Sequence, residues 1–114
     1  MTQQNTTILV TRKGMGQADP ELQITLMQSY LRTLNEAPQK PVEICFYAEG
    51  VHLVVEGSPV VHLLKLLADK GVRLTVCSTC LSYYDLLEQV AVGSRGTMVE
   101  IVEAQMQAEK VITI

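Results

Sequence analysis

The sequence has no tryptophan, one phenylalanine, four tyrosines and no excess of basic residues. Nine Lys and Arg against twelve Asp and Glu give a formal net charge of -3, which argues against the basic patch typical of nucleic-acid-binding proteins. No apolar run approaches the about 20 residues of a membrane span, and residues 1–7 lack the basic and apolar segments of a signal peptide. We therefore expect a cytoplasmic protein with no nucleic-acid or membrane partner.

What the sequence does contain is a large apolar fraction for its size. Hydrophobic residues make up 47% of the 114 positions, and the mean hydropathy is +0.19. Because this length is near the commonest domain size, residues 1–114 are predicted to form a single domain, with residues 1–6 as a flexible N-terminal tail. More apolar surface than one subunit can bury favours a homo-oligomer.

Apolar runs typical of strands alternate with amphipathic helical segments along the chain. Strands are predicted at residues 7–11, 42–47, 72–76 and 110–114. Helices are predicted at residues 20–35, at 59–70, from near Thr79 or Ser82, and after a loop at 93–96. Residues 51–55 fit either a short strand or an irregular loop.

Two of these helices have recognisable first residues. Asp19 precedes Pro20, and Ser58 precedes Pro59, so each pair offers a capping side chain followed by a proline at the first helical position. The helix at residues 59–70 is apolar on more than one face, which is typical of a helix covered on two sides. We expect one side to pack on the sheet and the other on a second subunit.

The alternation of strands and helices defines the fold class. Strands joined by helices of this length pair in parallel through right-handed crossovers, which predicts a three-layer α/β/α fold with a mostly parallel sheet. In such sheets, ligands bind outside the carboxyl ends of the strands. Residues 14–16, 48–50 and 77–80 are expected to converge at that edge.

Cys77 and Cys80 form a Cys-x-x-Cys pair at the junction between a predicted strand and a predicted helix. The chain has three cysteines, and in a reducing compartment a close pair is more often reactive or metal-binding than a structural disulfide. Free amides at a helix start favour the thiolate, which is the form that attacks sulfur. We predict that Cys77 carries the reactive sulfur and that Cys80 assists it. The competing interpretation is that both are small buried apolar side chains.

Other kinds of site have weaker support. A structural zinc site needs four ligands, and the residues that would supplement the pair, Cys45, His52 and His62, have no paired-ligand spacing. Gly14 and Gly16 lack the third glycine of a dinucleotide fingerprint and are interpreted as a tight turn. We expect no metal and no cofactor.

His52 and Arg95 are secondary candidates. His52 follows the second predicted strand and is interpreted as an exposed polar residue rather than a proton donor. Arg95 lies in a glycine-flanked loop, where it would either help to stabilise a thiolate or remain solvated.

The sequence resembles the DsrE/DsrF-like sulfur-transfer family over nearly its whole length, most closely the C-terminal domain of YedF-type proteins. The matching segments are Gly14-Met15-Gly16, Phe46-Tyr47, Gly50-Val51, Glu56-Gly57-Ser58, Cys77-Ser78-Thr79-Cys80-Leu81, Tyr83-Tyr84, Ala91-Val92-Gly93 and Lys110-Val111-Ile112. The resemblance implies a flavodoxin-like α/β/α arrangement, an oligomer, and a persulfide-carrying cysteine at the position of Cys77. The family's Cys-Gly-Thr-Cys reads Cys-Ser-Thr-Cys here, so Ser78 replaces a glycine and alters the freedom of the loop.

Together these observations predict a sulfur-relay protein that accepts persulfide sulfur at Cys77 from a donor protein and passes it to an acceptor, with Cys80 assisting release. Such a protein is an enzyme only in the sense of a sulfurtransferase. One alternative is a dithiol/disulfide redox module, for which the same pair suffices. The other is a non-catalytic oligomeric domain that binds a small ligand or assembles with partners.

Overall fold

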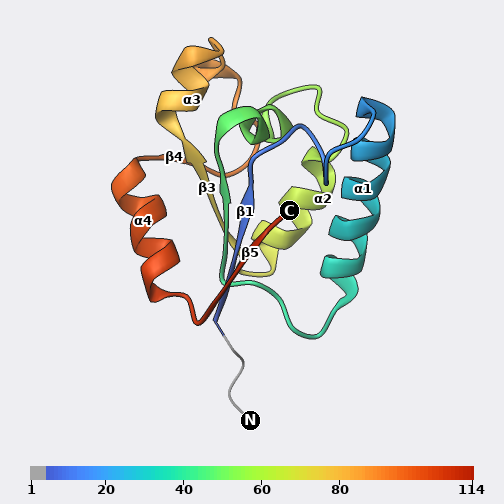
Figure 1. Ribbon diagram of the computed structural model, residues 1–114, viewed down its shortest axis with the longest axis vertical. Helices are drawn as coiled ribbons and strands as arrows, with labels where there is room; N and C mark the ends of the chain where they lie inside the picture. Colours follow the sequence, from blue (N-terminus) through green and yellow to red (C-terminus); the bar gives the residue numbers. More distant parts are fainter. Residues whose placement is uncertain (1–4) are drawn as a thin grey trace.

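The predicted strands lie side by side in one sheet. A computed structural model describes residues 5–114, in which the strand order is β4-β3-β2-β1-β5 and every neighbouring pair is parallel. The strands are β1 (Thr6–Val10), β2 (Glu43–Phe46), β3 (Arg73–Cys77), β4 (Ser94–Gly96) and β5 (Lys110–Thr113). Helices cover both faces of the sheet, which confirms the three-layer α/β/α prediction (Figure 1).

The sequence pattern predicted β4 as a loop. The residues Ser94–Gly96 pair with β3 and place Gly96 opposite Cys77. A strand of three residues, two of them polar, is too short to show an alternation of apolar and polar positions. Of the expected tail over residues 1–6, residues 1–4 lie outside the described residues. The Asn5 carbonyl accepts hydrogen bonds from the amides of residues 109 and 110, and Thr6 begins β1.

The helices begin close to the predicted positions but are capped differently. They are α1 (Pro20–Glu36), α2 (Val61–Asp69), α3 (Ser78–Tyr83) and α4 (Met98–Gln107), with the 3-10 segments η1 (Ala48–Val54) and η2 (Leu87–Gln89). Asp19 makes no side-chain capping hydrogen bond, although Pro20 is the first residue of α1. Ser58 Oγ accepts a hydrogen bond from the Val60 amide at 3.3 Å, so a turn precedes α2. Residues 51–55 belong largely to η1 and are neither the strand nor the loop considered from the sequence.

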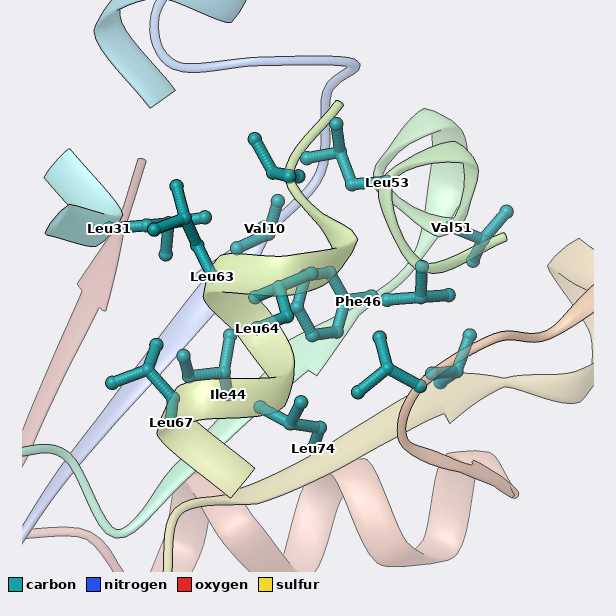
Figure 2. Packing of buried hydrophobic residues seen from close by; sticks show 14 of the residues in the cluster. Val10, Leu31, Ile44, Phe46, Val51, Leu53, Leu63, Leu64, Leu67 and Leu74 are labelled. Carbon is teal, nitrogen blue, oxygen red and sulfur yellow. The ribbon is translucent and has the colours of Figure 1, made fainter. Parts of the chain in front are cut away.

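One face of the sheet packs against α1 and α2. Every second strand residue points to this face, and these side chains form the main core with Leu31 of α1 and Leu64 of α2 (Figure 2). The strand residues are Ile8, Val10, Ile44, Phe46, Leu74 and Val76. The apolar residues of α2 that the sequence assigned partly to a second subunit are mostly inside this core, and Leu66, at 46% exposure, is the large one left outside.

The opposite face of the sheet is covered by α4 alone among residues 5–114 (Figure 1). It is more polar, because Glu43 and Thr75 are both buried there. The Thr75 hydroxyl donates to Glu43 Oε2 at 2.7 Å, which satisfies the buried carboxylate from within the sheet. Cys45 and Cys77 point to this same face and pack against Ile101 of α4.

The chain changes sides of the sheet after β4. The segments that follow β1, β2 and β3 pack on the face of α1 and α2, whereas β4 leads into α4 on the other face. Adjacent strands whose connections leave to opposite faces form a crevice at their carboxyl ends, and ligands of open α/β sheets bind in such crevices. In this fold the two strands whose connections leave to opposite faces are β3 and β4, and Cys77 pairs with Gly96 at their ends.

Gly50 provides a test of how tightly η1 is held. A Cβ at this position would lie 2.1 Å from the Val10 carbonyl oxygen, which is a backbone atom and cannot rotate away. We expect Gly50→Ala to lower the free energy of unfolding by about 1–3 kcal/mol. Urea unfolding of Gly50→Ala and the wild type measures this loss. An unchanged free energy of unfolding in Gly50→Ala would contradict the packing of η1 on β1.

Candidate functional site

The two cysteines of the pair occupy the junction of β3 and α3. Cys77 is the last residue of β3, and Ser78 begins α3, so Cys80 lies in the first helical turn. Ser78 therefore has an ordinary helical backbone conformation, and the position requires no glycine. Figure 1 shows α3 standing at the carboxyl edge of the sheet, beyond the end of β3.

The two thiols differ in their access to solvent. Cys77 is 2% exposed and packs with Leu9 of β1 and Ile101 of α4. Cys80 is partly exposed and packs on the edge of the same cluster. The sequence pattern predicted that the pair lies at the carboxyl edge of the sheet, as it does. It did not predict that the Cys77 thiol is buried and the Cys80 thiol partly exposed.

The segment after β2 reaches Cys80 through its backbone. The Ala48 amide donates a hydrogen bond to Cys80 Sγ over 3.1 Å. Ala48 has a φ of 52°, a left-handed conformation that is uncommon for residues other than glycine. No capping hydrogen bond to the Cys77 side chain is formed. The sequence predicted that amides at the start of α3 stabilise the Cys77 sulfur. The amide that contacts a sulfur of the pair comes instead from Ala48, in the segment after β2, and the sulfur it contacts is that of Cys80.

Two of the three segments expected to converge are in contact, because residues 48–50 reach Cys80 through Ala48. Lys13 Nζ lies 4.0 Å from Glu49 Oε2, but both charged side chains are more than half exposed, so this ion pair contributes little to stability. Residues 14–16 contact α1, since the Met15 amide donates to the Gln23 carbonyl. Their convergence on the cysteine pair stays a prediction.

The family model described as "DsrE/DsrF-like family" matches residues 4–114. The chain belongs to the DsrE/DsrF-like family. A comparison with curated protein sequences gave no significant match.

Solved structures with this fold come from bacteria and an archaeon. The ychN protein from E. coli aligns with a TM-score of 0.69 at 18% identity, covering 97% of this chain and 99% of that chain. The protein of unknown function MTH1491 from Methanobacterium thermoautotrophicum aligns at 0.71 and 20% identity, covering 97% and 99%. The conserved protein of unknown function BT1422 from Bacteroides thetaiotaomicron gives 0.69 and 15%, covering 96% and 95%. At these identities the similarity shows the fold.

Cys45 and Cys80 of this DsrE/DsrF-like chain have perturbed pKa values with different causes. Burial, together with the nearby Glu43 carboxylate, raises the pKa of the Cys45 thiol to about 12. Partial burial and then the neighbouring Cys77 thiol raise the pKa of Cys80, whereas the hydrogen bond from the Ala48 amide lowers it. Cys45 is thus a buried apolar residue in practice, whereas the Ala48 amide partly offsets the rise in the pKa of Cys80.

The secondary candidates lie around the pair without joining it. The His52 ring contacts Tyr84 edge-on with centroids 4.5 Å apart, and its Nδ1 lies 3.1 Å from the Glu49 carbonyl oxygen. Arg95 donates from Nη1 to the Leu87 carbonyl at 3.3 Å. His62 is exposed in the first turn of α2. The sequence missed Ala48 because its contribution is a backbone amide, which any residue except proline carries.

Among residues 5–114 no group of three or more His, Cys, Asp or Glu is arranged to hold a metal ion. Within that part of the chain, no helix is both long and apolar enough to cross a membrane.

The order of thiol reactivity follows from this geometry. In the folded protein we expect iodoacetamide to label Cys80 first, Cys77 more slowly, and Cys45 hardly at all. Because its pKa is raised, the labelling rate of Cys80 should still increase at pH values where an ordinary thiol of pKa about 8.5 has levelled off. Peptide mass spectrometry across pH measures each site. Labelling of Cys45 as fast as Cys80 would contradict the assignment.

Proposed function

We propose that this DsrE/DsrF-like chain is a sulfur-relay protein that accepts sulfane sulfur on the Cys77/Cys80 pair and passes it to an acceptor protein. The observation that supports the proposal is the position of the pair at the carboxyl end of β3 beside β4, with the Ala48 amide bonded to the more exposed thiol. Core cysteines such as Cys45 have no comparable contact with an amide from another segment.

The relay chemistry needs only the thiols. A thiolate of the pair attacks the outer sulfur of a donor persulfide, the donor's S–S bond breaks, and the donor leaves as a thiolate. The protein then carries a persulfide, whose outer sulfur is transferred to an acceptor thiolate by the same step. No net oxidation or reduction takes place, so no redox cofactor or metal is required.

Intact mass spectrometry tests the relay. Incubation with a cysteine desulfurase, or with a polysulfide as a small sulfane donor, should add the mass of one sulfur atom to the wild type and to Cys45→Ala. The double variant Cys77→Ala/Cys80→Ser should gain none, because no attacking thiol remains at the site. Addition of sulfur to the double variant at the wild-type rate would remove the pair from the function.

The dithiol/disulfide module is the second candidate, and the interaction between the two thiols supports it. Under mild oxidation without a sulfane donor, this candidate expects the wild type to lose two hydrogens, and Cys77→Ala, which keeps the more exposed thiol, to form mixed disulfides instead. If neither adduct nor disulfide forms while the fold persists in the double variant, the remaining function is a non-catalytic binding or assembly domain.

We also place the chain closest to the YedF-type members of its family and in the cytoplasm. The first assignment rests on the segments at residues 77–81 and 83–84. The second is supported by Cys45, Cys77 and Cys80, which are all free thiols and suit a reducing compartment.

A homo-oligomer is part of the proposal, and α4 supplies the surface for it. Met98, Val102 and Met106 recur every four residues on this helix and are 56%, 42% and 81% exposed, and Val99 beside them is 66% exposed. An apolar stripe of this kind on a surface helix is typical of a protein contact.

We expect Val102→Glu to dissociate the oligomer, because it places a charge in the middle of the stripe. Leu66→Glu on α2 is the matched control, since Leu66 is apolar and exposed to a similar extent, 46% against 42%. Multi-angle light scattering at micromolar concentration measures the mass. A wild type that is monomeric, or an oligomer unchanged by Val102→Glu, would contradict the role of α4.

A further inference from the structure

The burial of the pair raises a question about the route of sulfur. A persulfide donor must approach the attacking sulfur in line with the S–S bond that breaks. Cys77 is 2% exposed and lies under α3 and beside α4, so a donor protein cannot reach it while these helices are in place. Cys80 is partly exposed in the first turn of α3.

We propose that Cys80 is the entry and exit thiol of the pair, and that Cys77 is a second, protected position to which the sulfur moves inside the protein. This inference rests on the proposed relay and adds an order of transfer to it. The strand-end position of Cys77, which suggested from the sequence that it meets the donor, becomes the storage position.

The transfer consists of two displacements. In the first, the Cys80 thiolate attacks the outer sulfur of the donor persulfide, forms a new S–S bond, and releases the donor as a thiolate. In the second, the Cys77 thiolate attacks the outer sulfur now on Cys80, so that Cys77 holds the persulfide and Cys80 becomes a thiolate again. The Cys77 proton passes to the Cys80 sulfur or to water, and the electron count is unchanged. Release to an acceptor follows the same steps in reverse.

The Ala48 amide fits both steps. Its hydrogen bond to Cys80 Sγ stabilises negative charge on that sulfur, which is the attacking group in the first displacement and the leaving group in the second. The amide is held in place, because the Tyr47 amide donates to the Val10 carbonyl at 3.1 Å and Gly50 packs directly on that same carbonyl. Cys77 has no donor of this kind at its side chain.

The surroundings of Cys77 fit storage. Its neighbours are Leu9, Cys45, Ile101 and Ala104, and they exclude solvent from the sulfur. A persulfide in this position would be shielded from small thiols and oxidants, which remove or oxidise exposed sulfane sulfur. The two cysteines therefore have separate roles. Cys80 exchanges sulfur with other proteins, which requires exposure to solvent, and Cys77 stores it, which requires that solvent is excluded.

Time-resolved loading with polysulfide tests the order. Samples are capped with an alkylating agent at intervals, and peptide mapping locates the added sulfur on Cys80 or Cys77. In the wild type we expect sulfur on Cys80 first and then on Cys77. In Cys80→Ser, loading of Cys77 should slow by at least about tenfold, because the donor must wait for a local opening of α3 or α4.

Cys77→Ala separates storage from entry. This variant keeps the entry thiol and should still gain sulfur on Cys80, and a small thiol such as glutathione should then remove that sulfur at least about tenfold faster than from the wild type. Cys45→Ala is the control for a change in the same cluster and should match the wild type.

The outcomes distinguish this order from failure of the relay itself. Loading of Cys77 in Cys80→Ser at the wild-type rate would overturn the entry role, and equal lifetimes in Cys77→Ala and the wild type would overturn the storage role. No sulfur on any variant, the wild type included, would overturn the relay and with it the order of transfer.

Discussion

Parallel pairing of β1, β2 and β3 brings the carboxyl ends of these strands to a single edge, and the site depends on how the chain leaves that edge. The pairing of β2 with β1 extends one residue beyond β2, because the Tyr47 amide donates to the Val10 carbonyl. The Ala48 amide, which follows the extended Tyr47, donates to Cys80 Sγ, and Ala48 itself takes a positive φ at the start of η1. Gly50 can follow closely because it has no Cβ to strike the end of β1. The hydrogen bond from the Ala48 amide to Cys80 Sγ therefore depends on the pairing of β2 with β1.

The two faces of the sheet differ in polarity, and this difference sets the surroundings of the cysteines. The face towards α1 and α2 is fully apolar, whereas the face towards α4 holds Glu43, Thr75 and all of the strand cysteines. Cys45 lies in mid-strand beside the Glu43 carboxylate, where both burial and negative charge oppose ionisation. Cys77 lies on the same face two register positions further towards the carboxyl edge, since Cys45 pairs with Thr75. Position along the strand therefore separates a thiol whose ionisation is opposed from one that ends β3 and is followed directly by the helical turn holding Cys80.

Much of this architecture could be predicted from the sequence, because strand runs and helix stripes follow from the period of burial. The strand β4 could not, since three residues carry no period, and η1 could not, since its shape comes from packing on β1. The site was predicted as far as the Cys77/Cys80 pair and the edge it occupies. The burial of Cys77 depends on Ile101, which lies 24 residues away and reaches it only when α4 crosses to the far face. Ala48 acts through its backbone amide, so its residue type does not indicate this role.

The burial and hydrogen bonds of the cysteines also bear on whether Cys77 and Cys80 have a chemical function or only fill the core. Cys45 shows what a structural cysteine of this chain looks like, with complete burial, a carboxylate as its neighbour and no amide donor. Cys80 differs in two respects, because it is partly exposed and its sulfur accepts a hydrogen bond from a backbone amide. Ala48, which supplies that amide, begins η1 in a positive-φ conformation that costs a non-glycine residue about 1–2 kcal/mol. Stabilisation of negative charge on the Cys80 sulfur by this amide is what the proposed chemical functions of the pair require.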